Sequence, residues 1–381
     1  MMRSWFILIQ GLLPMMLISA YQYSWNLLIT PLMRSLNVDL PAIQVAYSLF
    51  VLFSTVSQVF GGYIADKRGP RLVGVTGGVL AGLGMMASPL VNGINQFYIL
   101  WSMGSIGVGL IYGVSINLGV KWFSRTRGLA TGIINMGFGL GATFFNPLIS
   151  LLIIKGEYKY PMILIGALIL AVVIPLMATA KYPTSQVKGM QPTKIPPGFW
   201  LAFTSFSLMG IPLQLFSSSL SVLGGDYGYV TVAAAASLLP LFSGIGRPIM
   251  GSISDKLSRR RTIIITGLVL TISMLTLLIH SPIAYIASTI ITGVFGGSLI
   301  TLFASLVGDE YGIVNSTFLF GILYNGKFIA ALMGSVMFAE LIRAINLTGS
   351  LILETSLTAA SIIVFIAFTK LHPRGYYLKN T

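Results

Sequence analysis

Long apolar segments of the length that crosses a lipid bilayer dominate this sequence. A membrane-spanning helix needs about 20 consecutive, mostly apolar residues. Twelve segments meet this rule, near residues 5–30, 41–64, 73–91, 96–120, 129–154, 161–179, 199–223, 229–254, 262–280, 283–306, 317–340 and 347–370. Charged residues make up only 8% of the chain, against about 25% in soluble domains. The sequence therefore predicts an all-α membrane protein with twelve transmembrane helices and excludes a soluble fold.

A polar stretch rich in Pro and Lys separates the first six segments from the last six. It divides the chain into an N-terminal bundle (1–180), a linker (181–198) and a C-terminal bundle with a short tail (199–381). Lys and Arg are distributed unevenly between the loops on the two sides of the membrane. Seventeen of these residues lie on the side of the termini and the linker, and 4 lie on the other side. Positive loops stay in the cytoplasm. We therefore predict a multi-pass protein of the plasma membrane with cytoplasmic termini and linker.

The two halves repeat a short charged motif. It runs from Gly62 to Arg71 after the second segment and from Gly251 to Arg260 after the eighth, at an offset of 189 residues. Parallel six-helix repeats are typical of transporters that bind substrate between their halves. An acid among cations at a helix end can lock the cytoplasmic face through ion pairs, or the cations alone can set topology. The residues predicted to form the lock are Asp66, Lys67, Arg71 and Asp255.

Two cations, Arg247 and Lys327, fall inside predicted helices. The nearest acids on their own helices, Asp255 and Glu340, are two or more turns away. A charge at the bilayer centre costs at least about 2.5–3.5 kcal/mol, so the two cations together predict a bound anion. The alternative is that Arg247 binds helix carbonyls or reaches the membrane surface. Polar and aromatic residues expected to surround the anion are Tyr21, Gln22, Tyr23, Trp25, Tyr112, Asn117, Tyr324 and Asn325. At the repeat offset Arg247 corresponds to Gln58, and Lys327 to Phe138.

The motif from Gly62 to Arg71 resembles the G-x-x-x-D-[RK]-x-G-[RK]-[RK] loop of the major facilitator superfamily, with Pro70 as its one departure. Within that superfamily the chain is similar to the oxalate:formate antiporter family. The stretches that carry this resemblance are Gln22–Trp25, Gly107–Gly113, Lys121–Phe123, Arg127–Ala130, Gly246–Pro248 and Lys327. The resemblance implies the major facilitator fold, with twelve helices in two pseudo-symmetric halves.

The same resemblance implies roles for individual residues. Arg247 and Lys327 fall on the two positions that bind substrate carboxylates in that family. The positions that line the pocket are Gln22, Tyr23, Tyr112, Tyr324 and Phe138. Tyr324 replaces a Trp, Phe138 replaces a Tyr, and larger aromatics are missing around Phe295 and Leu299. These departures imply a small organic anion rather than oxalate in particular.

Together these features predict a secondary transporter that exchanges small mono- or dicarboxylates by alternating access. An empty, occluded site would hold two unpaired positive charges, and a bound carboxylate relieves that cost. The alternative is a proton-coupled monocarboxylate symporter, which needs an acid in the pathway. Glu340 and Glu354 are the candidates, and we expect both to be paired or near the outer surface.

Other classes of protein lack their characteristic residues. Cys is absent and there are only two His, so neither a catalytic triad nor a metal cluster is indicated. The glycine repeats follow no strand, as a nucleotide-binding loop would require. We therefore expect no enzyme, metal or cofactor, and no nucleic-acid partner. The expected partners are a small carboxylate and the bilayer, with a monomer as the functional unit. A sensor would need a signalling domain, for which the residues after Lys370 are too few.

Overall fold

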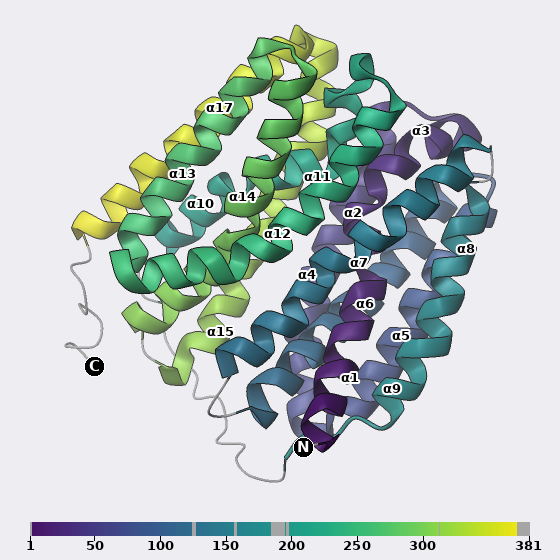
Figure 1. Cartoon of the computed structure of the whole chain (residues 1–381), viewed down its shortest axis with the longest axis vertical. Helices are drawn as coiled ribbons and strands as arrows, with labels where there is room; N and C mark the ends of the chain where they lie inside the picture. The colour runs from purple at the N-terminus through teal and green to yellow at the C-terminus, as the bar shows by residue number, and fades with distance from the viewer. Residues whose placement is uncertain are drawn as a thin grey trace.

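The computed structural model describes residues 2–123, 127–155, 158–183, 195, 198–311 and 313–371; the side chains of 2–4, 66, 127–129 and 313–318 lie outside this description. Nearly all of the described residues are helical (Figure 1). The α-helices of the N-terminal half are α1 (Met2–Ile18), α2 (Ala20–Tyr23), α3 (Trp25–Leu36), α4 (Leu40–Arg68), α5 (Pro70–Ala87), α6 (Ile94–Trp122), α7 (Arg127–Ile154), α8 (Lys159–Leu168) and α9 (Ile174–Ala178).

The C-terminal half repeats this arrangement. Its α-helices are α10 (Phe199–Met209), α11 (Ile211–Leu223), α12 (Tyr229–Leu257), α13 (Arg259–Thr276), α14 (Pro282–Tyr311), α15 (Ile313–Tyr324), α16 (Gly326–Leu332) and α17 (Phe338–Leu371). Two π-helical turns complete crossings, at Ile169–Val173 between α8 and α9 and at Met333–Met337 between α16 and α17. The described residues contain no β-strand.

The first crossing is longer and more irregular than the sequence predicts. It consists of α1, α2 and α3, with breaks at Ser19 and Ser24, and it continues to Leu36, where the prediction ends at residue 30. The polar residues Arg34 and Ser35 lower the apolar character of the last turn, yet the helix persists until Asn37. Asn37 has a φ of 51°, and this left-handed conformation ends the helix.

The crossings in the described residues agree with the predicted twelve. Eleven apolar helical stretches are long enough to span a membrane, and the last of them, Leu319–Leu371, covers 53 residues. That length is about twice what one crossing needs. The stretch turns back at Asn346, where φ is 77°, so it forms the eleventh and twelfth crossings. An even number of crossings puts the start of α1 and the end of α17 on one side, here called the terminal side; the opposite side is called the far side.

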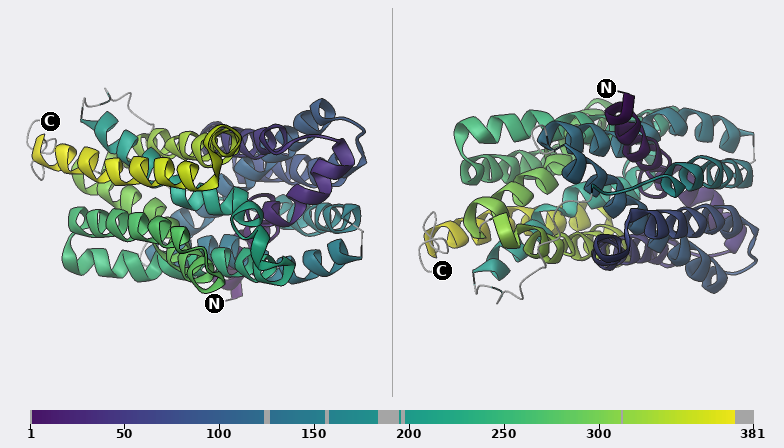
Figure 2. Two further views of the ribbon diagram at one scale, coloured as in Figure 1. Left: turned by 90° about the horizontal axis from the view of Figure 1, so that it is seen from above. Right: turned by 90° about the horizontal axis from the view of Figure 1, so that it is seen from below.

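The two halves lie side by side (Figure 2). Within each half, small residues let the helices approach closely, as is usual in lipid. A Cβ at Gly107 would lie 2.4 Å from the backbone nitrogen of Ala81, and one at Gly141 would lie 1.9 Å from the carbonyl oxygen of Met16. Between the halves, α7 packs on α12, α4 on α16, and α3 on α11. These three contacts bring the two predicted buried cations to the interface.

Candidate functional site

Arg247 and Lys327 are both buried between the halves, and each binds an amide of the opposite half. Lys327 on α16 is 9% exposed, and its Nζ donates to Gln22 Oε1 of α2 at 2.8 Å. Arg247 on α12 is 5% exposed, and its Nη1 donates to the backbone oxygen and the Oδ1 of Asn135 on α7, at 2.9 and 2.5 Å. The cations of the C-terminal half therefore meet neutral oxygens of the N-terminal half.

The positive charge of this pair is not neutralised within the described part of the chain. Ion pairs between described residues involve Arg259, Arg260 and Arg343, but neither Arg247 nor Lys327. The Nε of Arg247 is buried without a hydrogen-bond acceptor. Arg247 and Tyr112 bind the same oxygen of Asn135, and Tyr112 stacks on Tyr324, whose ring lies 5.7 Å from the Nζ of Lys327. The two cations therefore lie at one site. Buried charges normally have a partner of opposite sign, and an anion between these two would supply one.

Aromatic rings surround the pair. The ring of Phe138 lies 5.7 Å from that of Tyr23 and 5.6 Å from that of Tyr112, and Tyr112 stacks on Tyr324 at 6.4 Å. The Nζ of Lys327 lies 5.7 Å from the centroid of the Tyr324 ring, within the range of a cation–π interaction. The sequence prediction placed all of these side chains at one site, and the structure brings them together there.

Hydroxyl groups connect the rings to the rest of the site. Tyr112 donates its OH to Asn135 Oδ1 at 2.9 Å, the same oxygen that Arg247 binds. Tyr23 OH and Ser243 Oγ are 3.1 Å apart, again across the two halves. A ligand that reached Arg247 would therefore disturb Tyr112 as well, because both share one acceptor.

A small cavity opens beside Lys327. Its volume is about 10 Å³, enough for roughly one water molecule. Five predicted site residues line it: Gln22, Tyr112, Phe138, Tyr324 and Lys327. Such a small volume suits a conformation in which the side chains have closed on one another.

Other predicted residues lie elsewhere. The hydroxyl of Tyr21 donates to the backbone oxygen of Ala81 at 2.7 Å, and the indole of Trp25 donates to Gln44 Oε1 at 3.2 Å. Both rings pack on Trp101, so they belong to the core of the N-terminal half and their predicted place around the anion is wrong. Asn325, between α15 and α16, donates through Nδ2 to the backbone oxygen of Gly321 on α15. Neither Asn325 nor Asn117 lines the cavity.

Sequence reasoning also missed residues of the site. Gln58 and Ser54 of α4 line the cavity, and Gln58 is the repeat counterpart of Arg247. The sequence repeat could therefore have identified Gln58 as a candidate site residue. Asn135 was missed because an isolated Asn in an apolar helix has no motif; only the contact with Arg247 reveals it.

Hydrogen bonds between described residues join the halves only at the level of the two cations or farther toward the far side. On α4, Tyr47 OH donates to Gln214 Oε1 at 2.9 Å, and Ser48 Oγ lies 2.8 Å from Ser335 Oγ. At the far end an ion pair joins Asp39 and Arg343 at 2.9 Å. The structure is therefore closed on the far side.

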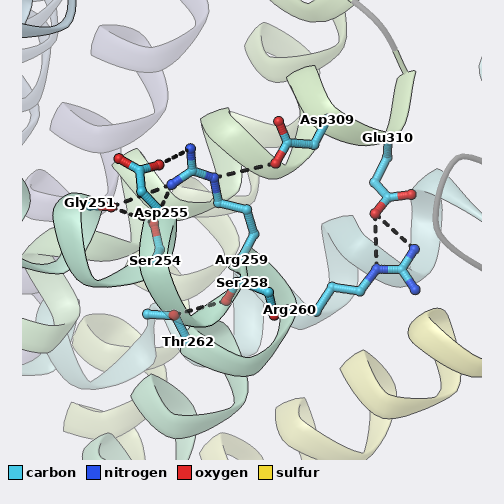
Figure 3. Close-up of polar contacts among 9 residues, drawn as sticks. All are labelled: Gly251, Ser254, Asp255, Ser258, Arg259, Arg260, Thr262, Asp309 and Glu310. Carbon is cyan, nitrogen blue, oxygen red and sulfur yellow. Dashed lines mark hydrogen bonds and ion pairs between the residues drawn. The ribbon is translucent and has the colours of Figure 1, made fainter.

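The predicted lock residues lie on the terminal side. The side chain of Asp66 lies outside the described residues, Lys67 donates to the hydroxyl of Tyr63 four residues earlier, and Arg71 is exposed. In the C-terminal half Asp255 pairs with Arg259 at 2.5 Å, and Arg259 Nε lies 3.4 Å from Asp309 (Figure 3).

A third ion pair lies beside these two. Arg260 pairs with Glu310 at 2.8 Å, and the side chain of Glu310 is only 3% exposed (Figure 3). These three ion pairs tie α12, α13 and α14 together inside one half and do not join the two halves. A lock that includes Asp66 stays a prediction.

Glu354 differs from its expected place. The side chain on α17 is fully buried, and neither carboxyl oxygen has a hydrogen-bond partner among the described residues. The expectation of a paired or surface Glu is wrong, because the packing of the C-terminal half buries this side chain without a partner among the described residues. Glu340 is exposed, 3.8 Å from Arg343.

Two helical halves that meet at a charged, aromatic-lined site are the architecture of a membrane transporter. The sequence matches the Major Facilitator Superfamily over residues 12–246 and 202–380. The chain belongs to this superfamily, which confirms the predicted family and fold.

The proteins similar to the chain include the following three. An uncharacterised 38 kDa protein in the 23S RNA operon of Thermoproteus tenax is 34% identical over 367 residues, covering 96% of this chain and 95% of that protein. The oxalate:formate antiporter of Oxalobacter formigenes is 31% identical over 383 residues, covering 96% and 90%. A crystal structure of a mutant of the nucleoside transporter NupG superposes with a TM-score of 0.76 at 13% identity, covering 95% and 99%. That likeness concerns the fold alone.

Proposed function

We propose that this protein is a secondary transporter that exchanges small organic anions, mono- or dicarboxylates, by alternating access. The observation that carries the proposal is the pair Arg247 and Lys327, buried between the halves and bonded only to neutral oxygens and rings among the described residues. Because a buried cation gains most from an anionic partner, the site favours negatively charged ligands.

In the proposed complex a carboxylate takes the acceptor positions that Asn135 and Gln22 now hold. The guanidinium of Arg247 offers two parallel N–H donors to one carboxylate, and the ammonium of Lys327 acts as a point charge. The rings of Tyr112, Phe138 and Tyr324 limit the room to a small, flat anion. Similarity to the oxalate:formate antiporter supports this class of substrate.

Exchange follows from the same charges. When the carrier changes conformation without a ligand, it must enclose two positive charges away from water. Only neutral amides then solvate them, and they repel each other, so this state is costly. A bound carboxylate removes most of that cost. The loaded carrier therefore reorients faster than the empty one, so one anion crosses in exchange for another.

The proposal includes the arrangement predicted from the sequence. Residues 1–180 and 199–381 form the two bundles that rock about the site, and the linker 181–198 lies in the cytoplasm with both termini. The protein acts as a monomer in the plasma membrane.

A proton-coupled monocarboxylate symporter is the second candidate. Glu354, buried without a partner, favours it because unpaired acids inside membrane proteins often carry protons. The two candidates differ in proton movement, since exchange of carboxylates of equal charge leaves the luminal pH unchanged.

The test uses purified protein in proteoliposomes that hold a pH-sensitive dye. Counterflow of labelled formate, acetate, oxalate, malonate and succinate measures exchange, and thermal shifts with the same panel measure binding, because a ligand stabilises the state it binds. We expect at least one small carboxylate to stabilise the protein and to exchange without a change in dye signal. Uptake that changes the luminal pH would favour the symporter, and a panel without any binding would refute the substrate class.

A further inference from the structure

Helix α11 is broken on the far side of the candidate site. Ser219 has φ −135° and ψ 18°, outside the helical region. In an unbroken helix the oxygen of Phe216 would accept from the nitrogen of Leu220. Both groups instead bind the side-chain amide of Asn26 on α3: Nδ2 donates to Phe216 O at 3.0 Å, and Oδ1 accepts from Leu220 N at 2.6 Å. The amide of one half thus replaces a backbone hydrogen bond of the other half.

The same break has further partners in the N-terminal half. Asn26 Nδ2 also donates to Ser217 O at 2.7 Å. Gln44 on α4 donates through Nε2 to Ser218 O at 2.8 Å and to Ser219 Oγ at 3.1 Å. Trp25 holds the Oε1 of Gln44, so this amide is fixed in orientation as well. We call Asn26 and Gln44 the amide clasp.

The amide clasp is buried, and a large hollow lies next to it. Asn26 is 3% exposed and Gln44 is fully buried. A hollow of about 680 Å³ is lined by Asn26, Thr30 and Arg34 from α3 and by Ser221 and Tyr229 beyond the break. Asn26 therefore lies at the boundary between this hollow and the packed interface. Separation of the two halves on the far side would begin at this boundary.

We propose that Asn26 and Gln44 are positioning residues that hold the break of α11 closed and thereby set the balance between the closed and open states of the far side. This inference rests on the alternating access of the proposed function. Buried backbone groups need hydrogen-bond partners. In the closed state the clasp supplies them, and when the halves part, water takes over.

Neutral hydrogen bonds suit a reversible contact of this kind. Exchanging a protein partner for water changes the free energy little, whereas burying a backbone group without a partner is costly. The clasp can therefore open in each cycle. Removing its amide penalises only the closed state, so a clasp variant should populate the open state more.

The absence of Cys from the chain permits a single-thiol test. Ser221→Cys places a reporter at the hollow, where the serine Oγ is buried without a hydrogen-bond partner. The reporter protein is reconstituted in proteoliposomes, and a membrane-impermeant maleimide is added inside or outside in separate samples. The labelling rate from the far side then measures how often that side opens.

We expect Asn26→Leu to raise the labelling rate of the Ser221→Cys reporter about tenfold, equivalent to about 1.4 kcal/mol. Gln44→Leu should raise it in the same direction. Gln10→Leu is the matched control: Gln10 is also a buried glutamine with two hydrogen bonds, to Leu176 O and Thr179 Oγ1, but both lie within its own half. Its labelling rate should equal that of the reporter alone.

An unchanged rate in Asn26→Leu and Gln44→Leu would overturn the proposal, as would an equal rise in Gln10→Leu. If Asn26→Leu does not fold, Asn26→Ala and Gln44→Leu decide in its place. Because labelling requires no substrate, a rise in rate without any carboxylate binding would refute the proposed substrate and leave the clasp intact.

Discussion

At the scale of single residues, the main feature is a pair of buried cations without an acidic partner among the described residues. Arg247 and Lys327 are buried as deeply as core residues, yet neutral amides of the opposite half hold them. An apolar pair of the same volume would pack at lower cost. Two such cations at one interface therefore support the proposed anion site.

The first prediction removes each charge in turn. Arg247→Gln and Lys327→Gln should each weaken carboxylate binding by about 30- to 3,000-fold, because truncating one member of a desolvated charge pair costs about 2–5 kcal/mol. The ligand-free variants should be no less stable than wild type, since each loses an unpaired buried charge. Thermal shifts and counterflow measure both effects. Normal exchange by both variants would make the cations structural.

The second prediction separates charge from geometry at Arg247. Arg247→Lys keeps the positive charge but loses the planar pair of donors, so binding should fall substantially. Lys327→Arg keeps a charge at a position where Lys acts as a point charge, so part of the binding should remain. Dissociation constants from the same carboxylate panel compare the two, and equal losses would contradict the bidentate role of Arg247.

At the scale of helices, the ends on the terminal side of the C-terminal half form a rigid unit. Two of its salt bridges differ in burial. In Arg260–Glu310 the side chain of the acid is 3% exposed, whereas in Asp255–Arg259 it is 64% exposed. Burial decides how much the loss of each pair costs. Solvent screens the charges of an exposed pair, so its loss costs little. Removing one partner of a buried pair leaves an uncompensated charge away from water, which is costly.

The third prediction follows from this contrast. Glu310→Gln should lower the melting temperature markedly, because it leaves the guanidinium of Arg260 without its acid. Asp255→Asn should change the melting temperature little, because exposed pairs contribute about 0–1 kcal/mol. Fluorescence-monitored thermal unfolding in detergent compares the two variants. Equal effects would show that burial does not set the strength of these ion pairs.

The fourth prediction concerns the repeated motif in the other half. Asp66→Asn should leave the fold intact and slow transport, because the predicted lock loses its acid. Exchange rates in proteoliposomes, with protein yield as the control for folding, measure the effect. A rate equal to that of wild type would reduce Asp66 to a loop residue without a role in transport.

At the scale of the whole molecule, hydrogen bonds and an ion pair hold the two halves together on the far side. Every hydrogen bond between described residues of different halves lies at the cations or toward the far side. A carrier of this shape opens to the other side by rocking one half on the other. The direction of opening in the cell then depends on which side faces the cytoplasm.

The fifth prediction fixes that orientation. The loop charges place both termini and the linker 181–198 in the cytoplasm. A protease site inserted into the linker should resist cleavage from outside intact cells and be cut after permeabilisation. Cleavage in intact cells would reverse the orientation and make the far side cytoplasmic.

The sequence alone determined the class, the number of crossings and the family. Apolar length, loop charge and the repeated motif are local properties of a chain in lipid, so they can be read without coordinates. The two buried cations were also predictable, because ionisable residues in spans are rare and mark function. The rings of Tyr112, Phe138 and Tyr324 were predicted from the sequence repeat and from the family resemblance.

Only the tertiary structure decided which polar side chains meet them. Tyr21 and Tyr23 are two residues apart on one short helix, yet Tyr21 joins the core of its half and Tyr23 faces Ser243 across the interface. Asn135, Asn26 and Gln44 carry no motif, and their partners in the opposite half are more than 100 residues away along the chain. The physical reason is that a hydrogen bond requires a position and a direction, and the packing of the two halves sets both.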